Sequence, residues 1–296
     1  MIHPGCIVPL TGIGLEEQLT APSSQVRRAA LPDEEPGDAP LRLLLAGVAF
    51  AAGLTGLFLL VWPGSTGRYF SWVLDPPPLA SLIGGSYVAS LFVFGAALRR
   101  PWSEVRGLVA GTLALTIPML SVTFFHMEVF DFGRWQAWAW VLLFVASPLS
   151  FGTILWLRRG SPFADDGPLA PAYRIISGLL AAVFSVVAIG LWWDPVETAR
   201  VLPFELPSFG GRVLGCWSSF LAFLGGWAAI RARAKEVQVP LLGIAWFMAG
   251  AIGGALRNFG DLGPTGRRAA YLLVLGALLA LTLASSRAAK VSANRL

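Results

Sequence analysis

The residues best suited to acid–base chemistry are His126, Glu128 and Asp131, which follow one another at the end of an apolar stretch long enough to cross a bilayer. An imidazole beside a carboxylate can exchange protons near neutral pH, so they form a candidate proton-handling pair. They could also supply a metal ligand or contact a lipid headgroup, and the simplest alternative is a histidine hydrogen-bonded at a helix end. His126 is the only histidine outside the first forty residues and has no cysteine nearby, so we predict no metal site.

A second group of candidates is formed by two arginines in a repeated pattern, Pro-x-x-Thr-x-Arg. The pattern occurs as Pro63-Gly-Ser-Thr66-Gly-Arg68 and as Pro195-Val-Glu-Thr198-Ala-Arg200. The two guanidinium groups could form one anion site. Alternatively, they extend toward lipid phosphates or cap the end of a span, with Thr66 and Thr198 as N-caps of a short interfacial helix.

The pattern belongs to a longer internal repeat. A shift of 132 positions without a gap places Arg42 on Arg174, Ser86 on Ser218, Arg99 on Arg231 and Gly111 on Gly243. The same shift places Asn258 opposite His126, so the two halves differ in chemistry there. The candidate ligand-binding residues are therefore Arg68, Arg200, His126, Asn258, Glu128 and Asp131.

Composition indicates where these residues lie. Hydrophobic residues make up 55% of the 296 residues, charged residues only 13%, and the mean hydropathy is +0.67. This is too apolar for one soluble domain. Apolar runs predict eight spans, at 43–62, 79–98, 107–126, 136–157, 174–193, 212–230, 239–256 and 269–286. We expect these spans to be helices, because a continuous apolar run lacks the alternation of a membrane barrel strand and every backbone group in the bilayer core must be paired within the protein.

We therefore predict an all-α integral membrane protein with eight transmembrane helices arranged as two parallel four-helix repeats. The domains are a flexible cytoplasmic tail at 1–40, a first four-helix repeat at 41–157 and a second at 173–289. Because each half has an even number of spans, both halves enter the membrane from the same side, as in parallel repeats.

Orientation follows from the distribution of Lys and Arg. Seven of the 22 fall in the loops after the odd-numbered spans or beside them: Arg68, Arg134, Arg200, Arg212, Arg257, Arg267 and Arg268. The others belong to the termini and the remaining loops. The positive-inside rule then predicts a multi-pass protein of the cell (inner) membrane with both the N-terminus and the C-terminus in the cytoplasm.

The span interiors carry little chemistry. No Asp, Glu, Lys or Arg lies deep in a predicted span, whereas proton relays and ion-coupled carriers place such residues there. Close glycine spacing in the seventh span, at Gly250 and Gly254, predicts tight helix packing.

No nucleotide-binding loop, nucleophile elbow or metalloprotease string is present, and nucleic acid is not a predicted partner. The predicted partners are the lipid bilayer and either other membrane subunits or a lipophilic ligand, with no cofactor predicted.

Two resemblances bear on function. A bundle of two four-helix halves resembles haem A synthase, but that family implies paired histidines in each half, so bis-His haem is excluded here. Three strings, Trp62-Pro63, Thr123-Phe-Phe-His126 with Phe130, and Trp138-Ala-Trp140 with Pro148, resemble an uncharacterised family of multi-pass membrane proteins from high-GC bacteria. That resemblance implies no activity that can be transferred.

Three functions remain open. The preferred one is a non-catalytic binding or accessory/structural membrane module. The first alternative is a transporter or flippase of a small or lipophilic solute. The second alternative is an outer-leaflet membrane enzyme that uses His126.

Overall fold

Eight long helices make up most of the part of the chain that the structure describes. The structure, a computed structural model, describes residues 38–163 and 167–293. The long helices are α1 (Asp38–Val61), α3 (Pro77–Ala97), α4 (Trp102–Phe125), α5 (Trp135–Leu157), α6 (Pro171–Trp193), α8 (Ser208–Arg231), α9 (Ala234–Arg257) and α10 (Thr265–Ala293). All eight are long and apolar enough to span a membrane, which confirms the predicted all-α membrane fold. The predicted tail, 1–40, lies outside the described residues except for 38–40, which begin α1.

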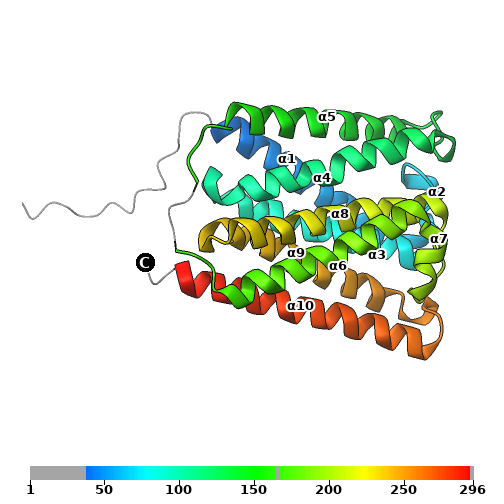
Figure 1. The fold of residues 1–296 in the computed structure, drawn as a ribbon. Helices are drawn as coiled ribbons and strands as arrows, with labels where there is room; N and C mark the ends of the chain where they lie inside the picture. The colour runs from blue at the N-terminus through cyan, green and yellow to red at the C-terminus, as the bar shows by residue number, and fades with distance from the viewer. Residues whose placement is uncertain (1–37, 164–166, 294–296) are drawn as a thin grey trace, which may run out of the picture. The chain divides into compact units, whose positions relative to one another are not determined.

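Short helices join the long ones at one end of the bundle. They are η1 (Pro63–Ser65), α2 (Thr66–Tyr69), η2 (Met127–Val129), α7 (Pro195–Thr198), η3 (Ala199–Val201) and η4 (Phe259–Asp261). We call this the short-helix end, on the right in Figure 1. Proline stands within the first two positions of η1, α3, α6 and α7, where its missing N–H breaks no helical hydrogen bond.

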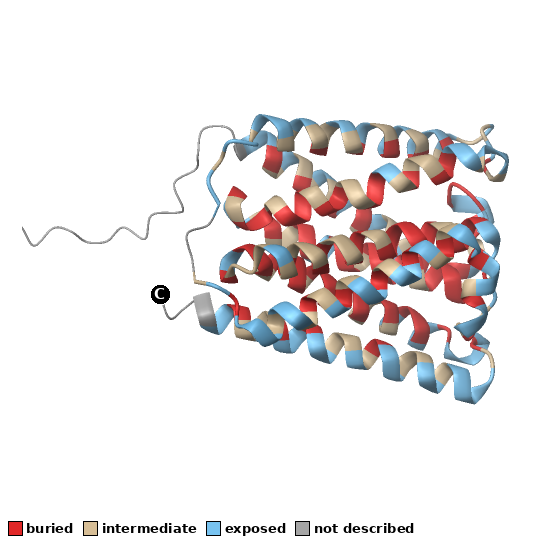
Figure 2. Cartoon of the chain, viewed as in Figure 1, coloured by how far each residue is buried: buried red, intermediate tan, exposed pale blue. Residues whose placement is uncertain are grey.

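Four helices form the interior. Helix α3 packs along α9, and α4 packs along α8, while α1, α6, α5 and α10 pack outside them against α3, α8, α4 and α9 respectively. Each long helix contains an apolar stretch of 18 residues. The buried share of this stretch is 50% in α4 to 67% in α3 for the inner helices, but only 17% to 28% for the outer helices. Figure 2 shows the same contrast in colour. The outer helices therefore present most of their surface to lipid.

Glycine lets α3 and α9 approach closely. A Cβ atom added at Gly85 would lie 2.0 Å from the carbonyl oxygen of Gly250, and one at Gly254 would lie 2.4 Å from the carbonyl oxygen of Ser81. Gly250 and Gly254 thus lie on the face of α9 that packs against α3. Gly253, by contrast, has open space beside it. The close packing predicted from the glycine spacing of the seventh span is therefore found between α9 and α3.

The helix bounds repeat along the chain. Helix α4 spans Trp102–Phe125 and α9 spans Ala234–Arg257, so both bounds differ by 132 positions, and η2 and η4 differ by the same amount. This parallel supports the predicted duplication, which we keep as a proposal. It also places His126 and Asn258 at equivalent points, each directly after an inner helix.

Candidate functional site

His126 is held where α4 ends. Its backbone N–H donates to the carbonyl of Thr123 at 3.3 Å, and its carbonyl accepts from the N–H of Val129 at 3.0 Å. These bonds turn the chain from α4 directly into η2. The turn brings the Glu128 side chain back toward the imidazole, with Oε1 of Glu128 3.1 Å from Nδ1 of His126. The predicted pairing of His126 with a neighbouring carboxylate is therefore present, with Glu128 as the partner.

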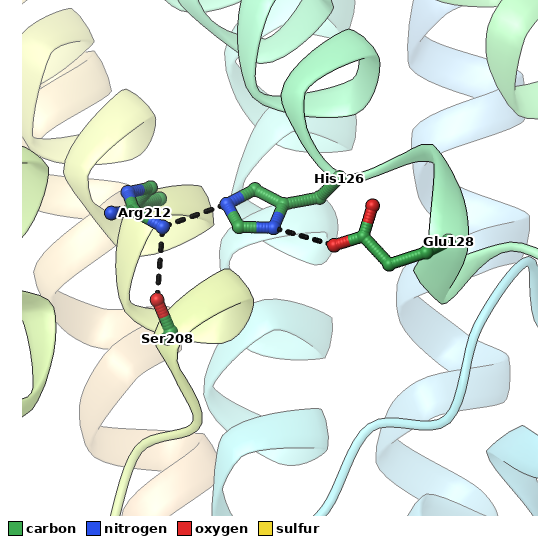
Figure 3. Close-up of polar contacts among 4 residues, drawn as sticks. All are labelled: His126, Glu128, Ser208 and Arg212. Carbon is green, nitrogen blue, oxygen red and sulfur yellow. Dashed lines mark hydrogen bonds and ion pairs between the residues drawn. The ribbon is translucent and has the colours of Figure 1, made fainter.

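The other ring nitrogen of His126 contacts a residue from a different helix. Nη1 of Arg212, in the second turn of α8, lies 2.7 Å from Nε2 of His126 and 2.9 Å from Oγ of Ser208 (Figure 3). A guanidinium group can only donate, so Nε2 must accept. This assigns the proton of a neutral imidazole to Nδ1, which then donates to Glu128.

The His126 side chain is partly buried, whereas the Glu128 side chain is exposed to solvent. The His126 side chain is 18% exposed and the Glu128 side chain 69% exposed. The Phe209 ring meets the imidazole edge to face at 5.5 Å, and His126, Glu128 and Phe209 line a cleft of about 380 Å³ at the short-helix end.

The backbone N–H of Glu128, and then the hydrogen bond from His126, hold the pKa of the Glu128 carboxyl below its ordinary value.

The geometry limits what His126 can do in this state. A general base needs a free ring nitrogen aimed at the proton that it removes. Here Nε2 faces Arg212 and Nδ1 faces Glu128, so both nitrogens already take part in contacts within the protein. The same two contacts leave no free nitrogen for a metal ion. What the arrangement does directly is to join α4 to α8.

The other predicted residues lie apart from this cluster. Oδ1 of Asp131 accepts from the backbone N–H of Gly133 at 3.0 Å, which closes its own loop. The side chain amide of Asn258 donates to Oγ of Ser81, and both residues are buried. This bond joins α9 to α3 in the same way that His126 and Arg212 join α4 to α8.

The two arginines of the repeated pattern border different clefts. Arg68 extends over the ring of Tyr69 at 5.1 Å and lines a cleft beside η1 and α2. Arg200 forms an ion pair with Glu197 at 2.9 Å and lines another cleft, beside Arg267. Within the described part of the chain, no contact joins Arg68 to Arg200, so the geometry gives no support to a shared anion site.

The N-cap prediction is wrong for Thr66, whereas Thr198 stands at the N-cap position of η3 but makes no side-chain cap bond there. Oγ1 of Thr66 accepts from the backbone N–H of Leu74 at 3.0 Å, which closes the loop after α2, and no side-chain cap bond begins α2. Thr198 ends α7, whose N-cap is Asp194. Asp194 accepts from the N–H of Glu197 at 3.0 Å. Threonine is a good capping residue in general, but neither of these two hydroxyls makes a cap bond, and the side-chain cap of α7 comes from Asp194.

Arg212, Ser208 and Ser81 are the residues that sequence reasoning missed. The one available signal for Arg212 is its position in the repeat, since the residue 132 positions earlier is Ala80. Arg212 is thus a charged residue in the first turns of a span whose equivalent in the other half is uncharged, which indicates a role that the two halves do not share. No family model matches the chain, and comparisons with curated proteins and with solved structures find no match.

Proposed function

We propose that this polytopic membrane protein is a non-catalytic binding or accessory module, in which polar contacts at the short-helix end hold the inner helices together. The observation that carries the proposal is the 2.7 Å contact between Nη1 of Arg212 and Nε2 of His126. It engages the nitrogen that an outer-leaflet enzyme would need as its base. The imidazole therefore works as an interhelical connector.

The proposal is supported by the matching contact in the other half. Asn258 stands 132 positions after His126 and joins α9 to α3 through Ser81. An amide has no acid–base chemistry near neutral pH, so what the two positions share is hydrogen bonding between helices. If the halves arose by duplication, the role that positions 126 and 258 share is to join inner helices. Proton exchange is not a shared role, because an amide does not titrate near neutral pH.

The orientation is part of the proposal. We place the protein in the cell membrane with both termini in the cytoplasm, on the strength of the Lys and Arg distribution. The short-helix end, with His126 and both clefts lined by Arg68 and Arg200, then faces outward. Membership of the uncharacterised high-GC family stays a proposal as well.

The test isolates the protein from its own membrane in polymer nanodiscs, which retain native lipid and associated subunits. Wild type is compared with His126→Asn, the residue found at the matching position. We expect intact-mass spectrometry to find the same lipophilic molecule or subunit, in fixed stoichiometry, with both proteins. Nothing bound to wild type would overturn the binding or accessory role. A new small molecule that accumulates only with a stably folded His126→Asn variant would mark an unprocessed substrate, and hence an enzyme.

A further inference from the structure

A cavity of about 230 Å³ lies among α1, α3, α4, α5 and α8, away from the His126 cluster. The cavity is partly open, and its rim includes Ala139 and Leu143, which are exposed on α5. Exposed residues of a spanning helix face lipid, so a molecule dissolved in the bilayer can reach the cavity from the side. Aromatic side chains make up much of the wall: Tyr87, Phe94, Trp140, Phe144, Phe151 and Trp217.

Four hydroxyl groups of the wall can accept hydrogen bonds but have no proton to give. They belong to Ser90, Thr112, Thr116 and Ser147. Each donates to the carbonyl four residues earlier in its own helix, at 2.6 to 3.1 Å. A hydroxyl oxygen also has two lone pairs, and no N–H or O–H of residues 38–163 and 167–293 donates to any of these four oxygens. This part of the wall therefore favours a ligand that donates a hydrogen bond.

A fifth hydroxyl in the wall, that of Tyr87, has no partner in the described part of the chain. Tyr87 is buried, with 8% of its surface exposed, and its hydroxyl makes no hydrogen bond there. The indole N–H of Trp217 is sealed inside the protein, whereas the Tyr87 hydroxyl keeps accessible surface. Buried polar groups are ordinarily satisfied. Because Tyr87 lines the cavity, a hydroxyl group of a bound molecule can be its missing partner.

The second half of the chain has apolar residues at the positions of the four accepting hydroxyls. The residues 132 positions later are Ala222, Ile244, Met248 and Leu279. Ile244 and Met248 are buried, and α6 packs directly against α10 in that half, whereas α1 and α5, both described over their whole length, have no comparable contact. Apolar residues therefore serve helix packing at these positions, so packing alone does not account for the hydroxyls of the first half.

We propose that this cavity binds the hydroxyl end of a membrane-soluble alcohol, an apolar molecule that carries one O–H group. The ligand donates to Oγ1 of Thr112 or Thr116, which lie one turn apart on α4, and its own oxygen accepts from Tyr87. A carbonyl or an ether cannot donate to the threonines, and a phospholipid tail brings only methylene and methyl groups.

The position and the size of the cavity agree with this ligand. Both threonines lie well inside α4, close to the bilayer midplane, where a hydroxyl without acceptors is costly. A cavity of about 150 Å³ already holds benzene, so 230 Å³ accommodates the hydroxyl and the first part of a chain, and the rest of the chain extends past α5 into lipid. The inference rests on the proposed function in naming the ligand of a binding module.

The test measures binding of dodecanol to the full-length protein in nanodiscs of synthetic phospholipid, by thermal shift and native mass spectrometry. Dodecyl methyl ether is the matched ligand, because it has the same chain and an oxygen that accepts but does not donate. We expect one dodecanol per chain and about tenfold weaker binding of the ether, the change that one lost hydrogen bond produces. Absence of dodecanol binding, or equal binding of both ligands, would overturn the inference.

Variants locate the binding site. Thr112→Val with Thr116→Val removes both acceptors with little change of shape, so it weakens dodecanol binding about tenfold and leaves the ether unaffected. Thr112→Ser with Thr116→Ser keeps both oxygens and binds dodecanol as wild type does. Thr282→Val is the matched control, because it removes a hydroxyl with the same type of bond to its own helix, in α10 and outside the cavity, and leaves binding unchanged.

Dodecanol binding that survives the loss of both threonine hydroxyls would also contradict the proposal. The comparison of the two ligands is made on wild type, so it holds even where a variant does not fold. None of these results alters the stoichiometry found in native nanodiscs, so the proposed function is judged separately.

Discussion

Nη1 of Arg212 lies 2.7 Å from Nε2 of His126, although 86 positions separate the two residues in the chain. The contact fixes the end of α4 against the beginning of α8, at the edge of the inner four helices. Because Arg212 also donates to Ser208, the guanidinium is held on its own helix while it reaches the imidazole. The pair therefore behaves as a connector between two helices that are already packed together.

The first prediction concerns this connector. His126→Ala and Arg212→Ala should each lower the free energy of unfolding by about 1 kcal/mol, the usual size of a polar contact between membrane helices. Together they should cost less than the sum, because the first substitution already removes the shared bond. Unfolding in mixed detergent micelles, followed by circular dichroism, measures the free energy of unfolding of the two single variants and of the double variant. Additive losses would contradict a direct coupling between the two side chains.

The second prediction follows from the lowered pKa of Glu128. A carboxyl whose pKa is lower in the folded state adds stability above its unfolded pKa of about 4.3, and this stability is lost as the pH falls through the folded pKa. Glu128→Gln keeps an acceptor oxygen but loses the charge. The stability difference between wild type and Glu128→Gln should therefore be present at neutral pH and disappear in acid. Thermal melts from pH 7 down to pH 3 measure it, and a difference that grows in acid would have the wrong sign.

The third prediction compares the two interhelical contacts. Ser81 is fully buried and Asn258 nearly so, whereas Glu128 and part of His126 face solvent. Ser81→Ala leaves a buried amide without its partner, which lowers the free energy of unfolding by about 1–3 kcal/mol. This loss should exceed the loss caused by His126→Ala, because the His126 side chain is partly exposed. Ser81→Thr keeps the hydroxyl and serves as the control for side-chain size. If Ser81→Ala were milder than His126→Ala, burial would not govern the strength of these contacts.

The spans could be predicted from sequence because the thickness of the bilayer fixes a length and a polarity. The fourth predicted span, 136–157, agrees closely with α5 at Trp135–Leu157, whereas the eighth, 269–286, is shorter than α10 at Thr265–Ala293. Helices continue past the apolar core into the headgroup region, where hydropathy gives no signal. Which helices lie inside could not be predicted, because lipid-facing and helix-facing residues are equally apolar.

The candidate site was predictable only where it is local. His126 and Glu128 are two positions apart, so a turn after α4 is enough to bring them together. The contacts of His126 with Arg212 and of Asn258 with Ser81 depend on how α4 and α9 pack, which no spacing along the chain encodes. The repeat indicated that position 258 matters but gave no partner for it.

The fourth prediction tests the orientation. In a Cys6→Ser, Cys216→Ser background, Val201→Cys places a thiol at the short-helix end, where Val201 is 78% exposed. Gly160→Cys places one at the opposite end, in a loop position with open space around it. A membrane-impermeant maleimide should label Val201→Cys in intact spheroplasts and Gly160→Cys only after lysis. The reverse pattern would place both termini outside.

The fifth prediction concerns the approach of α3 to α9. A methyl group at Gly250 would lie 2.2 Å from the carbonyl oxygen of Gly85, against backbone that cannot rotate away. Gly250→Ala must therefore push the two helices apart, and we expect a loss of about 1–3 kcal/mol or more in the free energy of unfolding.

Gly253→Ala is the matched control for this prediction, since it makes the same change on the same helix. No atom lies within 4 Å of the added methyl at Gly253, and alanine favours a helix by up to about 1 kcal/mol over glycine. Gly253→Ala should therefore be neutral or slightly stabilising. Both variants are compared by thermal melting in one detergent. Equal melting temperatures would mean that α3 and α9 do not meet through Gly250, and the helix alignment that brings Asn258 to Ser81 would then be wrong as well.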